Sequence, residues 1–250
     1  MATTAPVVLA TWNLHAGVGT DGHFDLDRIA EEIRRVRPDV IALQEVDAYR
    51  TRSQSVNMWR SLGHRTGLAA FFGPTLVGPE PSTGSAAPSP TRPIPQYGNA
   101  VLTRLAPRAV ENHRLSGPEG AEPRGCLEVV FDTWTCLVTH WGLDAAERRA
   151  QCEDVADMVS RADASGRPAA VLGDLNAVRV SPEIERLRGL RLDAGAGAGA
   201  TFPAPTPTRR IDYVFLPPTW RVAGAEVVNT VASDHLPLVV TVLPPPGTGT

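Results

Sequence analysis

A carboxylate and an imidazole stand side by side at Asp234 and His235, directly before an apolar run from Leu236 to Leu243. An aspartate can hold a metal ion, and a histidine can transfer protons near neutral pH. The pair alone is weak evidence, because Asp-His pairs also occur in loops, where they cap turns. Its meaning depends on which polar residues flank the other apolar runs of the chain.

Residues with metal-binding or proton-transfer chemistry also end four other apolar runs. Each of them alone has an ordinary explanation as a turn residue, a solvated strand end or a hydrogen-bonded histidine. Together they indicate a shared rim, because rigid strands fix positions at their ends and the adjoining loops give access. The residues are Asn13, Glu45, His140, Asp174 and Asn176.

The donor atoms of this set are mainly carboxylate and amide oxygens, without paired-histidine spacing. Such hard oxygen ligands suit Mg²⁺ or Mn²⁺ better than Zn²⁺. Divalent cations of this kind usually work on phosphate groups. The three cysteines, Cys126, Cys136 and Cys152, lack CxxC spacing and are expected to be buried free thiols.

Apolar and β-branched runs alternate with helical patterns along the chain, as expected of an α/β protein. Most of the polar residues above follow a predicted strand. Strands are expected at 7–12, 40–43, 98–103, 124–131, 133–139, 169–172, 211–216, 223–228 and 236–243. Helices are expected from a cap at Asp25 or Asp27 to 37, at 58–66, at 145–162 and after a cap at Ser181.

The composition predicts one domain over 1–250. The chain has 250 residues, of which 42% are hydrophobic and 20% charged, as is ordinary for a globular enzyme. Its core is expected to span about 7–243. The region at about 74–96 is rich in Pro, Ser, Thr and Gly and predicts a mobile loop, and 244–250 predicts a frayed tail.

The charge pattern argues against a broad nucleic-acid-binding face. The formal net charge is −3, and all 24 basic residues are arginine. The N-terminal residues lack the basic and apolar segments of a secretory leader, and no apolar run is long enough for a membrane span. The cytoplasm is therefore the expected compartment, while the sequence leaves the oligomeric state open.

Six short blocks occur in one order along the chain. They are TWNLH at 11–15, LQEV at 43–46, YGNAVLTR at 97–104, GDLNA at 173–177, RRIDYVF at 209–215 and SDHLPL at 233–238. From about residue 7 to 243 the chain resembles the endonuclease/exonuclease/phosphatase superfamily, which includes exonuclease III, deoxyribonuclease I and sphingomyelinase. The resemblance implies a four-layer α/β sandwich, with two mixed β-sheets face to face, helices outside and a divalent-metal site at one end between the sheets.

The resemblance also assigns roles at the metal and at the water nucleophile. It implies that Glu45 is the principal ligand of Mg²⁺ or Mn²⁺, with Asn13 beside it and Asp234 in the same acidic cluster. It further implies that Asp174 orients or deprotonates the attacking water, and that Asn176 donates a hydrogen bond to a phosphate oxygen.

Two histidines receive roles in the same way. His235 is expected to pair with Asp212, which favours the imidazolium form, so that the pair either activates water or stabilises the transition state. His140 is expected to contact a phosphate oxygen or assist the leaving group. Where relatives commonly have a leucine and an acid after this histidine, the chain has Trp141 and Gly142, which puts a carboxylate partner in doubt.

Three further residues match family positions near the site. Arg124 is expected to bind phosphate or to form a structural ion pair, and Tyr97 and Asn99 to lie beside the substrate or to pack. A weaker match covers Thr201, Phe202 and Pro203. His15 receives no role, although on an extended backbone it would share a strand face with Asn13.

The substrate implied by the resemblance is a phosphate ester, and the reaction is its metal-dependent hydrolysis. Neither the block found in inositol 5-phosphatases nor the aromatic hairpin of secreted sphingomyelinases is present. The low positive charge favours a small or single-ended ester. Nucleic acid, cut by an endonuclease or exonuclease, stays open as a less favoured substrate, and a catalytically silent binding protein of the same fold is a remote alternative.

Overall fold

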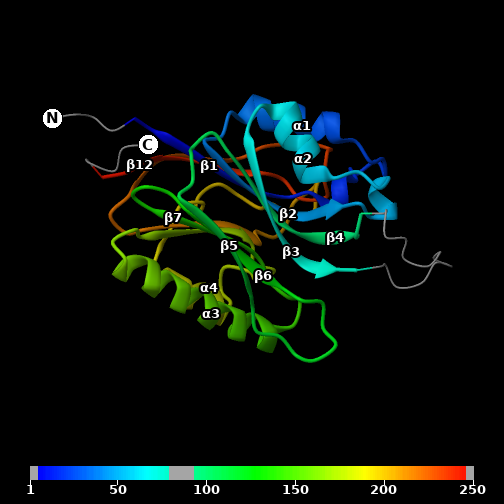
Figure 1. The fold of residues 1–250 in the computed structure, drawn as a ribbon. Coiled ribbons are helices and arrows are strands. Elements are labelled where there is room, and N and C mark those ends of the chain that lie inside the picture. The colour runs from blue at the N-terminus through cyan, green and yellow to red at the C-terminus, as the bar shows by residue number, and fades with distance from the viewer. Residues whose placement is uncertain (1–4, 79–92, 246–250) are drawn as a thin grey trace.

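The computed structural model describes residues 5–78 and 93–245 of the chain. It consists of two six-stranded sheets packed face to face with helices on both outer sides (Figure 1). This confirms the predicted four-layer α/β sandwich. The layers differ in their helices: α1 (Leu26–Val36) and α2 (Met58–Thr66) lie against the first sheet, and α3 (Ala145–Ala164) and α4 (Pro182–Arg188) against the second.

The first sheet has the strand order β11-β12-β1-β2-β4-β3. Its central strand β1 runs parallel to β2 and antiparallel to β12. The 3₁₀ turns η1 (His15–Gly17) and η2 (Thr51–Ser53) follow β1 and β2. The strands are β1 (Val7–Asn13), β2 (Val40–Ala48), β3 (Ala69–Val77), β4 (Gln96–Thr103), β11 (Arg221–Val227) and β12 (Leu238–Leu243).

The second sheet has the strand order β5-β6-β7-β8-β10-β9. Strand β8 runs parallel to β7 and antiparallel to β10, so the end of β8 meets the end of β7 and the start of β10. The strands are β5 (Ala109–Arg114), β6 (Gly125–Val130), β7 (Thr135–His140), β8 (Ala169–Asp174), β9 (Leu192–Asp193) and β10 (Asp212–Leu216).

The two sheets enclose an apolar core. Leu9 and Val101 from the first sheet pack with Leu127 and Leu172 from the second, and all four are almost fully buried. Burial of this kind is the main favourable contribution to folding. In the described part of the chain, no helix is long and apolar enough to cross a membrane.

The predicted helix caps and free thiols are confirmed. Asp25 accepts hydrogen bonds from the first backbone N–H groups of α1, and Asp144 does the same for α3. All three cysteines are buried and free. Local sequence signals therefore place these helix starts correctly.

The predicted strand at 40–43 and the predicted loop at 74–96 have the wrong boundaries. Strand β2 continues to Ala48, past the point where the apolar run stops. Pro74 to Val77 belong to β3 and Gln96 to β4, so the loop is shorter than expected. Proline is tolerated because β3 is an edge strand, where a missing N–H costs little. Residues 79–92 and 246–250 lie outside the described residues.

Strands β5 and β9 were not predicted from the sequence. Strand β5 is an edge strand whose side chains are mostly exposed, so it lacks an apolar alternation. Strand β9 has only 2 residues, too few for a pattern.

The packing between the sheets predicts a large effect of cavity formation. Leu127 is 1% exposed, so Leu127→Ala should lower the free energy of unfolding by about 2–5 kcal/mol. Leu143 is 76% exposed, and Leu143→Ala should change it by less than about 0.5 kcal/mol. Urea denaturation followed by circular dichroism measures both variants. Equal stabilities of the two variants would contradict this packing.

Candidate active site

Three ionisable side chains form a row across neighbouring strands of the second sheet. Asp174, at the end of β8, is in register with His140 on β7 and with Asp212 on β10. All three side chains are buried. The pairing of strand ends that the sequence suggests therefore brings these residues together.

Asn13 connects this row to the first sheet. Its side-chain Nδ2 donates one hydrogen bond to Glu45 Oε1 and one to Asp174 Oδ2, each 3.0 Å long. Its Oδ1 accepts from the backbone N–H of His15. Asn13 is 1% exposed, so these bonds are shielded from bulk water. It thus orients two carboxylates from different sheets, while its role as a direct metal ligand stays a prediction.

Glu45 lies inside β2 rather than at its end. The register of β2 against β4 shifts between Leu43 and Val46, and Glu45 has a positive φ of 55°. This bulge re-aims the side chain toward Asn13. A positive φ at a non-glycine residue is strained, and such strain concentrates at functional sites.

His235 lies between two aspartates. Its Nδ1 is 3.0 Å from Asp212 Oδ2, and its Nε2 is 3.7 Å from Asp174 Oδ2. Burial alone would lower the pKa of His235, but the charge and hydrogen bond of Asp212, followed by the charges of Asp174 and Asp234, raise the pKa to about 9. His235 is therefore an imidazolium ion at neutral pH.

Asp174 has the opposite character. Burial and the nearby charge of Asp212 raise the pKa of Asp174 to about 7, against the effects of His235 and of the hydrogen bonds from Asn13 and Asn176. A carboxyl group with a pKa near the working pH is suited to accept or donate a proton.

The partner of His140 Nδ1 is a guanidinium rather than a carboxylate. Arg124 Nη1 lies 3.1 Å from His140 Nδ1. Burial, with a contribution from the charge of Arg124, lowers the pKa of His140 well below its usual value. Because a guanidinium only donates, Nδ1 of His140 accepts this hydrogen bond. Nε2 lies 3.1 Å from the side-chain Nδ2 of Asn176, which also donates to the Trp141 carbonyl oxygen, and 3.6 Å from Asp174 Oδ2.

Asp234 lies next to η1. Its Oδ1 lies 3.8 Å from Nδ1 of His15, a residue to which the sequence analysis gave no role. Ser233 fixes this turn, because its hydroxyl donates to the carbonyl oxygen of Asn13 and accepts from the backbone N–H of His235. The only sequence signal for His15 is its spacing of two residues from Asn13.

The three remaining predicted residues lie close by with other partners. Arg124 also forms an ion pair of 2.9 Å with Glu122. The Asn99 amide donates to the carbonyl oxygen of Gly125, which joins β4 to β6 across the two sheets. Burial, with the charge of Glu45 as the next cause, raises the pKa of Tyr97, and Arg52 lies over its ring. Contact of these residues with a substrate stays a prediction.

The donor set fits a divalent cation with oxygen ligands. Glu45, Asp174 and Asp212 bring three carboxylates to one end of the sandwich, and Oδ1 of Asp212 is buried without a hydrogen-bond partner. Ligand atoms of Asp174, Asp212 and His235 lie within 4.8 Å of one another. A protonated His235 cannot ligate a metal, however, so this buried triad is better suited to proton transfer.

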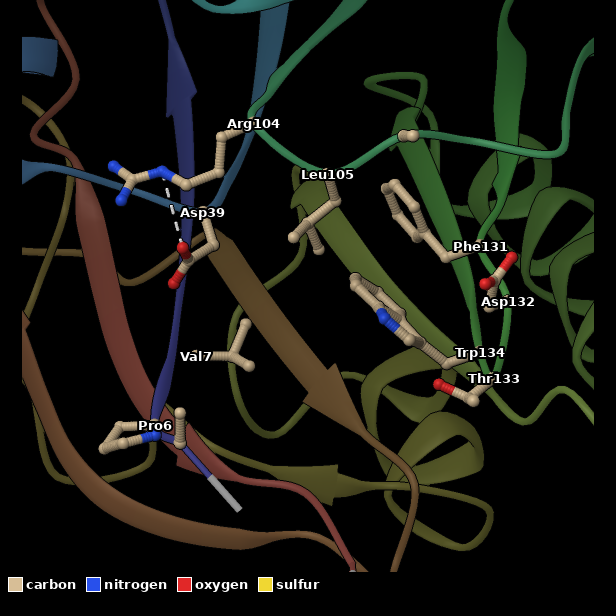
Figure 2. Close-up of a pocket in the computed structure, with 11 residues that line it drawn as sticks. Pro6, Val7, Asp39, Arg104, Leu105, Phe131, Asp132, Thr133 and Trp134 are labelled. Carbon is tan, nitrogen blue, oxygen red and sulfur yellow. Dashed lines mark ion pairs between the residues drawn. The ribbon is translucent and has the colours of Figure 1, made fainter. Parts of the chain in front are cut away.

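A cavity of about 460 Å³ lies at the opposite end of the sandwich (Figure 2). Phe131 and Trp134 form its apolar wall, and an ion pair between Asp39 and Arg104 borders it. Residues near the start of β1 and the end of β4 line this cavity, whereas the candidate site residues lie near the end of β1. It therefore does not belong to the site.

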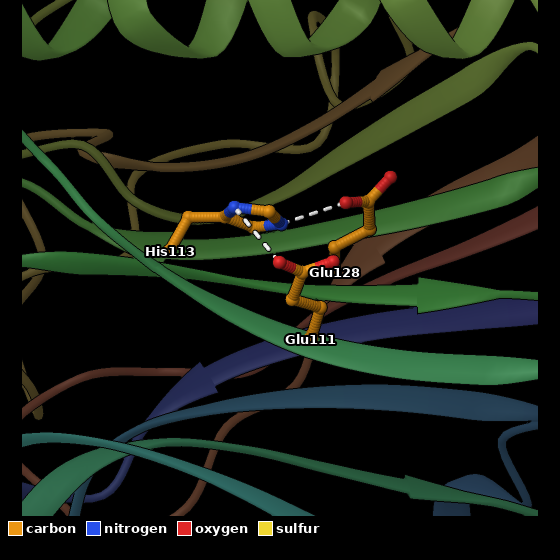
Figure 3. A group of neighbouring side chains, drawn as sticks. All are labelled: Glu111, His113 and Glu128. Atoms are coloured by element: carbon orange, nitrogen blue, oxygen red, sulfur yellow. Dashed lines mark hydrogen bonds and ion pairs between the residues drawn. The ribbon is translucent and has the colours of Figure 1, made fainter.

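A second group of metal-binding residue types lies on the edge of the second sheet (Figure 3). His113 Nε2 is 2.7 Å from Glu128, and His113 Nδ1 is 4.0 Å from Glu111. Glu111 and Glu128 stand directly opposite on β5 and β6, and the ring of His113 lies between their carboxylates. These cross-strand contacts account for the cluster without a metal ion.

Comparison with solved structures supports the fold assignment. An endonuclease/exonuclease/phosphatase from Beutenbergia cavernae is 26% identical, with a TM-score of 0.77 over 95% of this chain and 71% of that chain. The mannosyl-6-phosphatase Bt3783 of Bacteroides thetaiotaomicron is 17% identical, with a TM-score of 0.73 over 94% and 99%. The catalytic domain of human Nocturnin is 20% identical, with a TM-score of 0.71 over 95% and 94%.

The family assignment rests on the sequence match. The comparison with curated proteins gives no match. The model of the Endonuclease/Exonuclease/phosphatase family, whose members are generally hydrolytic phosphoesterases, matches residues 10–235 and so spans both sheets and every candidate site residue. The chain therefore belongs to the endonuclease/exonuclease/phosphatase family.

Proposed function

We propose that this protein is a Mg²⁺- or Mn²⁺-dependent hydrolase of phosphate esters. The observation that supports this most is the chain of contacts from Glu45 through Asn13 and Asp174 to His235. These contacts bring together the Glu45 carboxylate, which could bind a metal ion, a buried carboxyl group with a pKa of about 7 and a buried histidine with a pKa of about 9. These are the groups that phosphate-ester hydrolysis by water requires.

Glu45 and Asp234 would hold the cation, with Asn13 setting the direction of the Glu45 carboxylate. A divalent cation held there supplies positive charge to the phosphate oxygens. Asp174 accepts the proton of the attacking water. His235, kept protonated by Asp212, stabilises negative charge on the phosphate as the bond breaks.

His140 and Asn176 act as neutral donors in this proposal. Nε2 of His140 and the side-chain amide of Asn176 lie 3.1 Å apart beside Asp174, so a phosphate oxygen that enters between them could accept a hydrogen bond from both. Arg124 then acts mainly by holding the ring of His140, because its guanidinium already bonds Nδ1 and Glu122.

A small or single-ended ester is the favoured substrate class. The net charge is −3, and most arginines in the described residues are paired with carboxylates, for example Arg52 with Asp47 and Arg210 with Asp193. Little positive charge is left for the backbone of a long nucleic acid. The likeness in fold to a protein named as a mannosyl-6-phosphatase supports a small substrate.

Turnover of bis(p-nitrophenyl) phosphate and p-nitrophenyl phosphate tests the reaction. The wild-type protein should require Mg²⁺ or Mn²⁺ and lose activity with chelator, and His235→Ala should lower kcat by about 10²–10⁴-fold at any metal concentration. Asp234→Ala should weaken metal binding, so excess metal should restore part of its activity. Metal-independent turnover, or full activity of His235→Ala, would overturn the mechanism.

Plasmid DNA and RNA form the second arm of this test. A protein that favours small esters should cleave them more slowly than p-nitrophenyl esters under the same metal. Selective cleavage of DNA, falling steeply with added salt, would instead assign a nuclease.

The pairing with Asp212 predicts a measurable pKa change at His235. In metal-free protein, Asp212→Asn removes the largest effect that opposes burial, so the pKa of His235 should fall clearly below about 9. Asp234→Asn removes the smallest of these contributions and should lower it far less. Titration of the ring protons by NMR measures both. A pKa that stays near 9 in Asp212→Asn would show that another group holds the proton.

A further inference from the structure

A tight hairpin borders the catalytic histidine. Residues 202 and 209 pair as an isolated antiparallel bridge, with backbone hydrogen bonds in both directions between Phe202 and Arg209. Thr201 ties the hairpin to β10, because its hydroxyl accepts from the backbone N–H groups of Ile211 and Asp212. Its carbonyl oxygen accepts from the N–H of Leu236, next to His235. The hairpin is therefore held in place from two sides.

The hairpin stacks two side chains onto His235. The ring of Phe202 lies 4.6 Å from the ring of His235, centroid to centroid. The guanidinium of Arg209 lies 4.9 Å from the centroid of the Phe202 ring. One aromatic ring thus separates a cationic side chain from the imidazole that is aimed at the hydrolysed phosphate.

Arg209 has no carboxylate partner among the described residues, in contrast to its neighbour. Arg210 forms a two-point ion pair with Asp193, at 2.8 and 2.5 Å, and is largely buried. Arg209 is exposed, and its described side-chain contact is the face of Phe202. Stacking uses the flat face of a guanidinium and leaves its N–H edge free to bind an anion at two points.

We propose that Arg209 is a specificity-determining residue that binds a second anionic group of the substrate. The inference rests on the proposed phosphoesterase function. The substrate class is a small ester that carries two anionic groups. One is the phosphate to be hydrolysed, beside His235, and the other is a phosphate or a carboxylate that reaches Arg209 on the far side of the Phe202 ring. Phe202 holds the guanidinium in position, so little side-chain entropy is lost when the anion binds.

Calorimetric titration with phosphonates in Mn²⁺, with the free metal concentration held constant, tests this role without turnover. The probes are propylphosphonate, which has one anionic group, and propane-1,3-, butane-1,4- and pentane-1,5-bisphosphonate, which have two. The wild-type protein should bind one of the bisphosphonates about 10- to 100-fold more tightly than propylphosphonate, as expected for a charged two-point hydrogen bond.

Arg209→Ala should abolish that preference while changing the Kd of propylphosphonate less than about threefold. Arg209→Lys should keep part of it, because lysine retains the charge without the two-point geometry. The matched control is Arg221→Ala, an exposed arginine at the start of β11, which pairs with the end of β12 remote from His235. This variant should bind every probe as the wild type does.

The outcomes separate this inference from the function on which it rests. The role of Arg209 is overturned if the wild-type protein prefers none of the bisphosphonates. It is also overturned if Arg209→Ala retains the preference, or if this variant loses affinity equally for all probes. A wild-type protein that hydrolyses no phosphate ester with either metal overturns the proposed function, whereas the calorimetric comparison still decides whether Arg209 binds a second anion.

Discussion

Negative charge buried between the two sheets is the constraint on which the site depends. Asp174 and Asp212 are almost fully buried and Glu45 is half-buried beside them, in a region where an uncompensated charge is costly. The compensation within the chain is incomplete: His235 supplies one positive charge, and His140 is held neutral. Burial, and next the charge of Asp212, raise the pKa of Asp174. Such a group of carboxylates could hold a divalent cation.

Asn13 makes this concentration of charge tolerable without neutralising it. One amide nitrogen donates to a carboxylate of each sheet, and the amide oxygen is occupied by the backbone of His15. An aspartate at this position would add a fourth negative charge, and an aliphatic residue would leave two carboxylates without a donor. Two hydrogen bonds hold the turn at residues 233–235 against the end of β1. The Ser233 hydroxyl donates to the carbonyl oxygen of Asn13, and the indole N–H of Trp12 donates to the carbonyl oxygen of His235.

The sequence predicts which residues meet but not how each one is oriented. His140 and Asp174 were predicted from polar residues at the ends of apolar runs and Asp212 from the family resemblance, and strand register carries the three into one line. The bulge at Glu45 could not be predicted, since its positive φ is imposed by pairing with β4. The guanidinium partner of His140 comes from a strand start 16 residues earlier and is set by tertiary packing alone.

Strands without a buried face escaped prediction for a related reason. Strand β5 pairs fully with β6, yet its side chains are mostly exposed, so hydrogen bonding rather than apolar patterning defines it. The hairpin at 202–209 is another such case, since its proline and threonine residues gave no strand signal. Its proposed function depends on the Phe202 ring that it packs against His235. Most of the candidate catalytic residues stand on, or directly beside, strands with strong local signals. Residues that select the substrate are expected on loops whose conformation only the assembled fold determines.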